Sequence, residues 1–264
     1  MSRLHFQFGC GRLKLAGSLD TAPGTSGLLI VSGGNEIRSG AFSGQAKLAA
    51  AIAAKGFPVF RFDRRGVGDS EGENRGFTKS ARDIEAALEA FRAMAPQMKR
   101  VLAFGNCDAA SALMLSGGIG FDGLVLSNPW TMDDQPGKEA GDTSLPPPAS
   151  IRARYAAKLK NPRELARLAK GEVNLGKLAR GIARTFRKDT APTKLADTMR
   201  SGLAQFEGSV RFLLAEADRT AQVFNANWDS TDPRIARCAG AGHAYAKPEE
   251  RQWLEEQILA ALRT

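Results

Sequence analysis

The stretch Val-Leu-Ala-Phe-Gly-Asn-Cys-Asp-Ala, residues 101–109, carries the pattern that decides the fold. Its first four residues are an apolar run that predicts a buried strand, and a helix is predicted directly after Cys107. Gly105 and Ala109 are small enough to allow the sharp turn that joins the two elements. We therefore expect Cys107 to project from a nucleophile elbow at the edge of a sheet, above the N-terminus of the helix.

Short apolar runs alternate with helical patterns on both sides of this stretch. Predicted strands lie at 28–31, 57–62, 101–104 and 124–126, and predicted helices lie at 43–55, 79–94 and from the elbow to residue 115. This order favours an α/β fold with a mostly parallel central sheet that is flanked by helices.

The alternation stops at residue 129 and resumes after residue 205. Residues 131–150 include three consecutive prolines and are predicted as a linker, and residues 151–205 are predicted as helices. Strands follow at 210–214 and 234–238, with helices at 220–228 and 248–262. The predicted organisation is a core of residues 1–130 and 206–264, into which a basic helical cap or lid, residues 131–205, is inserted.

The positive charge is concentrated in the predicted cap. The chain has a net charge of +9, and residues 151–200 contain 14 Lys or Arg against 4 Asp or Glu. The rest of the chain is therefore close to neutral. Such a segment suits an anionic substrate, an anionic membrane surface or nucleic acid, and a solvated helical face is the simpler alternative.

Composition narrows the class of protein. The chain has 264 residues, of which 43% are hydrophobic and 25% charged, and this argues against disorder. No apolar run reaches the 18 residues typical of a membrane-spanning helix, and no secretory signal is visible at the N-terminus. Three cysteines do not make a disulfide framework. We therefore expect a cytoplasmic protein.

A histidine and an aspartate follow the last two predicted strands, where they could reach Cys107. Of the two histidines, His5 lies in a strand-like N-terminal stretch, whereas His243 lies in a Gly-rich loop and is the candidate general base. Asp218 is the preferred acid, because a carboxylate there could accept from the imidazole and orient it. Glu216, Asp229 and Asp232 are alternatives. A buried structural cysteine and a lone surface histidine are the corresponding non-catalytic interpretations.

The loop after the strand 28–31 is the second candidate contributor to the site. Backbone amides of Gly34 and Asn35, together with that of Asp108, are expected to form an oxyanion hole. Arg38 is a candidate for binding an anionic group of the substrate, and a surface salt bridge is the alternative role for this arginine.

Several motifs resemble a known superfamily. The stretch Phe-Asp-Arg-Arg-Gly-Val-Gly-Asp-Ser, residues 62–70, resembles the D-x-R-G-x-G-x-S turn of α/β-hydrolases and is interpreted as scaffold. The order nucleophile, acid, base also matches that superfamily. More closely, residues 33–40, 105–112, 151–159 and 170–175 are similar to the exosortase A system-associated hydrolases of type 1.

This resemblance implies an α/β-hydrolase fold over nearly the whole chain. It implies Cys107 as nucleophile, His243 as base and Asp218 as acid, and a link to bacterial exopolysaccharide and protein-sorting loci. Cys107 departs from the serine of the wider superfamily. A thioester intermediate would favour transfer to a nucleophile other than water.

Three hypotheses of function follow. The first is an acyl hydrolase or acyltransferase that acts on a small ester or thioester, which the basic cap would suit if anionic. The alternative is a catalytically inactive scaffold protein that docks an anionic partner or membrane through the cap. Nucleic-acid binding is not expected, because residues 151–185 contain just one aromatic residue, Tyr155. No metal-ligand spacing, Walker A pattern or G-x-G-x-x-G pattern is present, so no metal or other cofactor is expected.

Overall fold

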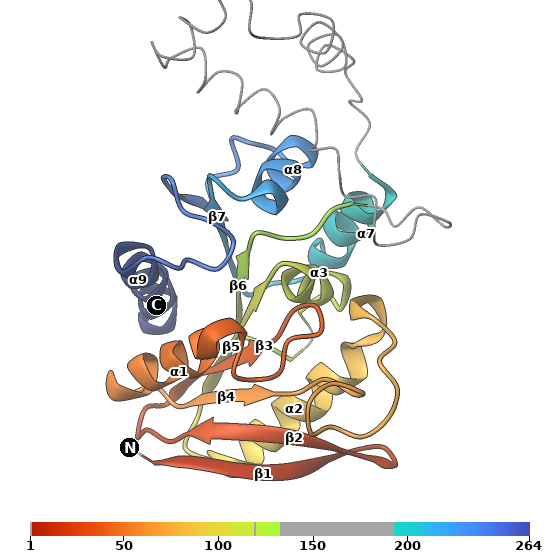
Figure 1. The fold of residues 1–264 in the computed structure, drawn as a ribbon, viewed down its shortest axis with the longest axis vertical. Helices are drawn as coiled ribbons and strands as arrows, with labels where there is room; N and C mark the ends of the chain where they lie inside the picture. Colours follow the sequence, from red (N-terminus) through yellow and green to blue (C-terminus); the bar gives the residue numbers. More distant parts are fainter. Residues whose placement is uncertain (1, 119, 133–192) are drawn as a thin grey trace, which may run out of the picture.

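The computed structural model describes residues 2–118, 120–132 and 193–264 (Figure 1). These residues form an eight-stranded sheet with the strand order β1-β2-β4-β3-β5-β6-β7-β8. The strands are β1 Arg3–Cys10, β2 Leu13–Asp20, β3 Ser26–Val31, β4 Val59–Phe62, β5 Arg100–Asn106, β6 Gly123–Ser127, β7 Ser209–Ala215 and β8 Ile235–Cys238. From β4 to β8 every neighbouring pair is parallel, whereas β1 and β2 form an antiparallel hairpin at one edge. The predicted mostly parallel α/β sheet is thereby confirmed.

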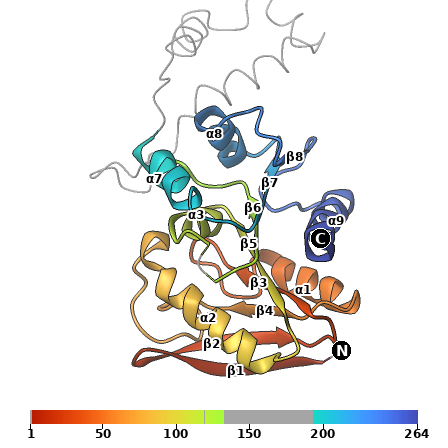
Figure 2. The ribbon, with the colours of Figure 1, turned by 180° about the vertical axis from the view of Figure 1, so that it is seen from behind.

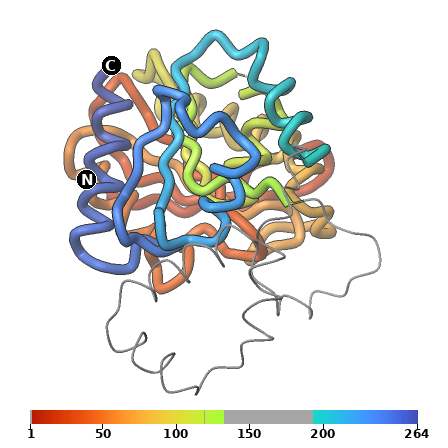
Figure 3. Tube along the Cα trace, turned by 90° about the horizontal axis from the view of Figure 1, so that it is seen from above, coloured from red at the N-terminus to blue at the C-terminus, as the bar shows by residue number. Residues whose placement is uncertain are grey.

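Helices cover both faces of the sheet (Figures 1 and 2). One face carries α1 Gly44–Ala54 and α9 Pro248–Arg263, which contact each other. The other face carries α2 Ala81–Met94, α3 Asp108–Leu115, α7 Lys194–Leu203 and α8 Arg219–Asn227. Figure 3 shows the C-terminal helix α9 beside the N-terminal third of the chain.

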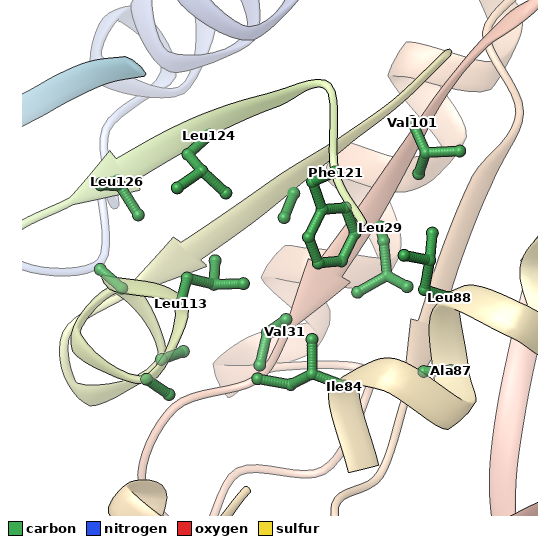
Figure 4. Packing of buried hydrophobic residues seen from close by; sticks show 14 of the residues in the cluster. Leu29, Val31, Ile84, Ala87, Leu88, Val101, Leu113, Phe121, Leu124 and Leu126 are labelled. Atoms are coloured by element: carbon green, nitrogen blue, oxygen red, sulfur yellow. The ribbon is translucent and has the colours of Figure 1, made fainter. Parts of the chain in front are cut away.

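Strand β3 shows why the central strands read as continuous apolar runs. Leu29 and Val31 pack into the core beneath α2 and α3, where Figure 4 shows them near Ile84. Leu28 and Ile30 point into the second core, beneath α1 and α9. Successive side chains of a strand point to opposite faces, so a strand that is covered on both faces is mostly apolar along its whole length.

The loops that follow the parallel strands gather at one edge of the sheet. Parallel strands place their carboxyl ends on the same side, so the loops after β3, β5, β7 and β8 become neighbours there. These loops contain the residues that the sequence singled out as candidates.

The predicted cap lies largely outside the described residues. Residues 133–192 are not described, and the end of the cap forms α7, which packs against α3. The division into core and cap therefore stays a prediction. None of the helices in the described ranges combines the length and apolar character needed to span a bilayer.

Candidate active site

Cys107 occupies a strained turn between β5 and α3. Its backbone has φ 62° and ψ −128°, a conformation that residues with a side chain rarely adopt. A Cβ atom on Gly105 would lie 2.7 Å from backbone atoms of Ala109 and Ala110, so only glycine fits there. This is the geometry of a nucleophile elbow, in which the side chain is held out at the end of the strand.

Backbone hydrogen bonds hold this turn in place. The Cys107 amide donates to the Ser127 carbonyl oxygen at 3.0 Å, and the Trp130 amide donates to the Cys107 carbonyl oxygen at 3.3 Å. Strained backbone persists where surrounding contacts over-determine it, and β6 with the loop after it supplies those contacts. The thiol itself is half-buried.

His243 lies between Cys107 and a buried carboxylate. Its Nδ1 is 3.0 Å from Oδ2 of Asp218, whose side chain is 7% exposed. Asp218 is also the N-cap of α8, because the Ala221 amide donates to the same oxygen at 3.2 Å. The helix therefore fixes the carboxylate, and the carboxylate orients the imidazole so that Nε2 faces the elbow.

These contacts change the acidity of His243. The hydrogen bond with Asp218 and then the one with the Cys107 thiol raise the pKa of His243 to about 10. Both contacts favour the charged imidazole, and they outweigh the partial burial that opposes it. At neutral pH the group beside the thiol is therefore an imidazolium.

The other half of the site is built around the Gly34 amide. This amide donates to Oδ1 of Asp108 at 2.6 Å, so a side chain occupies one of the three expected oxyanion donors. A Cβ atom on Gly33 would lie 2.7 Å from the same oxygen, which explains why the loop has glycine here. No partner is found within the described ranges for the backbone amides of Asn35 and Asp108.

A buried arginine that sequence reasoning did not assign supports this arrangement. Arg64 donates from Nη2 to the Gly34 carbonyl oxygen, and the same nitrogen is 3.7 Å from Oδ2 of Asp108. The Arg64 side chain is 5% exposed. We call Gly34, Arg64 and Asp108 the oxyanion-loop clamp.

Comparison with known proteins decides the family. A family model described as "Alpha/beta hydrolase family" matches residues 28–255. The chain belongs to this alpha/beta hydrolase family. No curated protein matches the chain.

Solved structures of this hydrolase fold resemble the chain over almost its whole length. DcsB, solved with a substrate analogue, is 13% identical with a TM-score of 0.65, and the match covers 99% of each chain. An esterase from Pyrococcus furiosus is 13% identical with a TM-score of 0.61, covering 99% of this chain and 91% of the other. A serine hydrolase homologue from Coxiella burnetii is 15% identical with a TM-score of 0.59, covering 98% and 97%. At such identities the likeness shows the fold.

Arg38 does not lie with the other candidates of this hydrolase. Its guanidinium forms ion pairs with Asp63 and Asp69, and its Nε donates to Ser18 at 3.1 Å. Its backbone amide also donates to Asp63. Its two terminal nitrogens thus pair with the turn at 62–70, and its Nε is bonded to β2. In this structure Arg38 therefore forms the salt bridges of its alternative role, and binding of a substrate group by Arg38 stays a prediction.

The alternative acids also lie apart from His243. Asp232 pairs with Arg234 at 2.6 Å, and hydrogen bonds from Arg234 lower the pKa of Asp232 to about 2. Asp229 accepts hydrogen bonds from Thr231, which lower its pKa, and Glu216 is exposed. Among the candidate acids, Asp218 is the one in contact with the imidazole.

A buried polar network beneath His243 was not predicted. Asn106 donates from Nδ2 to the His243 carbonyl oxygen at 3.2 Å and accepts at Oδ1 from Asn128 at 3.0 Å. Tyr245, which has φ 48° and is 2% exposed, hydrogen-bonds Ser127 at 2.9 Å. The one available signal was that Asn106 and Asn128 sit at strand ends, which does not show that they meet.

Proposed function

We propose that this alpha/beta hydrolase is a cysteine-dependent acyl hydrolase or acyltransferase that acts on a small ester or thioester. Cys107 is the nucleophile, His243 the general acid and base, and Asp218 the residue that orients and charges His243. The single observation that carries the proposal is the arrangement at the elbow, where His243 is bonded to Asp218 at 3.0 Å and its pKa is raised to about 10 by Asp218 and Cys107.

The first half-reaction forms an acyl-enzyme. The Cys107 thiolate attacks the carbonyl carbon, and the negative charge moves to the carbonyl oxygen, which accepts from the Asn35 and Asp108 amides. As the tetrahedral intermediate collapses, the bond to the leaving oxygen or sulfur breaks. His243 donates its Nε2 proton to that atom, which leaves as an alcohol or thiol.

The second half-reaction releases the acyl group. Neutral His243 takes a proton from water or from an acceptor alcohol, thiol or amine, and the resulting nucleophile attacks the thioester carbonyl. Collapse of this intermediate expels the Cys107 thiolate beside the imidazolium and restores the starting ion pair. Water gives a hydrolase, and an organic acceptor gives an acyltransferase.

Intact-protein mass spectrometry tests the proposal. The protein is incubated with a panel of acyl esters and acyl thioesters, as wild type, Cys107→Ala and His243→Ala. We expect a wild-type adduct of the acyl mass that maps to Cys107 and turns over, and no such adduct in Cys107→Ala. An adduct that persists until an organic acceptor is added identifies a transferase. Wild type that stays unmodified with every substrate contradicts the proposal.

The chain contains its own control for thiol reactivity. Cys10 and Cys238 are each 8% exposed, and burial raises the pKa of both thiols. Iodoacetamide should therefore label Cys107 well before the other two, and the preference should weaken in His243→Ala. Equal labelling rates for all three cysteines would argue against an activated Cys107.

One observation favours a second candidate function, an inactive scaffold protein. The Asp108 carboxylate occupies the Gly34 amide, which removes one donor from the oxyanion hole. In this case Cys107 would not acylate, and the protein would dock an anionic partner or membrane surface. The adduct experiment separates the two candidates directly.

Two sequence motifs indicate the subfamily and the biological system of the protein. Residues 33–40 and 105–112 are similar to the exosortase A system-associated hydrolases of type 1. We propose on that basis a role in bacterial exopolysaccharide or exosortase systems. Loss of an acylated cell-surface product after deletion of the gene would support it.

A further inference from the structure

A cavity of about 300 Å³ lies beside His243, between α1 and α9. Its apolar lining comes from both helices, from β5 and from the loop between β8 and α9: Leu48, Ala51, Phe104, Tyr245 and Leu254. His243 and Asn106 provide polar groups on the side of the elbow. A cavity of this size, whose lining combines apolar side chains with polar groups, is typical of a site for a small organic ligand.

The position of the cavity relative to the nucleophile indicates which part of a substrate it takes. It borders His243, whereas the oxyanion donors Asn35 and Asp108 are absent from its lining. In acyl transfer the histidine gives its proton to the leaving atom and takes one from the acceptor atom. The organic group on that atom must therefore lie on the His243 side of the reacting carbonyl.

The charges of the lining limit the chemistry of that group. Lys47 and Arg251 are balanced by Glu36 and Glu255, and the charge of His243 is matched by Asp218 behind it, so no excess charge of either sign faces the cavity. An uncharged apolar group fits such a site better than a phosphate or an ammonium group, because a charge would lose its hydration without a matching excess of countercharge.

We propose that this cavity binds the apolar organic group of the alcohol or thiol that leaves the acyl group or accepts it. The inference rests on the proposed acyl transfer at Cys107 and adds a substrate class to it. Small side chains of α1, above all Ala51, leave the room that the group occupies.

A pair of matched substitutions on α1 tests the proposal. Ala51→Leu fills the cavity, and Ala50→Leu adds the same side chain to the same helix outside the lining. With acetyl esters and thioesters of constant acyl group, we expect Ala51→Leu to slow acylation of Cys107 about tenfold for a benzyl leaving group. Methyl leaving groups should change less than about twofold, and Ala50→Leu should match wild type with both.

A second arm distinguishes a leaving group from an acceptor. Cys107 is first acetylated with the methyl thioester, and benzyl alcohol or benzyl mercaptan is then added. Faster loss of the acetyl adduct in wild type and Ala50→Leu, but not in Ala51→Leu, assigns the cavity to the acceptor. If the Ala51→Leu substitution slows acylation by the benzyl substrate but does not change the loss of the acetyl adduct, the cavity binds the leaving group.

A third arm measures binding without chemistry. Benzyl alcohol is titrated into Cys107→Ala with the wild-type α1 and with Ala51→Leu, and NMR shifts of Tyr245 and Leu254 are followed. We expect saturable shifts in the first protein and none in the second. Saturable binding in a protein whose Cys107 never acylates would overturn the proposed function and leave the cavity assignment standing. If Ala51→Leu slowed acylation equally for benzyl and methyl leaving groups or not at all, and benzyl alcohol did not bind, the cavity assignment would be overturned. The proposed function would still stand.

Discussion

Two different regions flank Cys107. On one side lies His243, whose pKa is raised by the Asp218 carboxylate and by the Cys107 thiol. On the other side the Gly34 amide donates to the Asp108 carboxylate. The histidine side is open: the His243 side chain is 43% exposed and borders a cavity. On the Gly34 side, the buried Arg64 holds the loop through the Gly34 carbonyl oxygen and the Asp108 carboxylate. In the proposed reaction, His243 exchanges protons with the substrate, and the backbone amides on the other side of Cys107 are held in place by Arg64 and Asp108.

This difference matches the two tasks of acyl transfer. A general acid and base must change its charge during the reaction, so it needs access and a partner that tolerates both forms. Oxyanion donors work best when they need no reorganisation during the reaction. The oxyanion-loop clamp would provide that rigidity, with Asn35 and Asp108 donating from the backbone.

The largest effect is expected at the carboxylate that orients the histidine. Asp218→Asn should lower kcat by about 10⁴-fold, because an amide favours the wrong imidazole tautomer and does not stabilise the imidazolium. The asparagine oxygen can still accept from the Ala221 amide, so the cap of α8 is retained. Asp229→Asn, an exposed alternative acid, is the control and should leave kcat within about twofold. A comparable loss in that control would reverse the assignment of the acid.

The clamp should give the next largest effect. Asp108→Ala releases the Gly34 amide and leaves Arg64 without its carboxylate, so we expect kcat to fall by roughly 10- to 100-fold. Stability should fall by about 1–3 kcal/mol, because a buried arginine loses a charged partner. Asp108→Asn keeps an acceptor for Gly34 and should lose less in steady-state kinetics and urea unfolding. An Asp108→Ala enzyme faster than wild type would mean that the carboxylate blocks the oxyanion site.

The contacts of His243 should also make the stability of the protein depend on pH. The folded-state pKa of His243, about 10, lies above the unfolded value of about 6.5. Its stabilising contribution is therefore fully present below about pH 6.5 and is lost as the pH rises toward 10. The difference in unfolding free energy between wild type and His243→Gln should shrink across that window in urea titrations.

NMR titration of variants can show which contacts raise the pKa of His243. In Cys107→Ser the contribution of the thiol is removed, so the His243 pKa should fall while the Asp218 contact keeps it above the unfolded value. A histidine that titrates at its unfolded value in wild type would contradict the stabilisation of charged His243 by Asp218.

The sequence predicts the fold well where both faces of a strand are buried. Strand β3 is a continuous apolar run for that reason, and β5 with its elbow adds a turn that only small residues permit. The hairpin strand β2 was not identified, because its residues 16–18 are Ala-Gly-Ser and give little strand signal. Strand β2 is instead formed by its pairing with β1 on one side and with β4 on the other.

Some residues of the candidate site could likewise be predicted from the sequence, and others could not. Sheet topology brings the ends of β5, β7 and β8 together, so Cys107, Asp218 and His243 could be paired from their places in the chain. The roles of Arg38 and Arg64 could not. Both arginines lie in loops after strands, and only packing decides that Arg38 binds Asp63 while Arg64 reaches Gly34.

The smallest effect is expected from the tyrosine beneath His243. Tyr245→Phe removes the hydrogen bond to Ser127, and we expect a loss of about 1 kcal/mol in stability and a two- to threefold decrease in kcat. The reason is that Tyr245 anchors the histidine loop through neutral hydrogen bonds, which are worth less than the charged contacts of the clamp.

A double-mutant cycle separates this anchoring from general damage to the core. Ser127→Ala and Tyr245→Phe should together cost about 1 kcal/mol less than the sum of the single losses, because each variant already breaks the same bond. Additive losses would mean that the Ser127–Tyr245 pair is uncoupled. If Tyr245→Phe instead cost as much activity as Asp108→Ala, the histidine side would depend on fixed packing as strongly as the Gly34 side, and the contrast between the two sides of Cys107 would not hold.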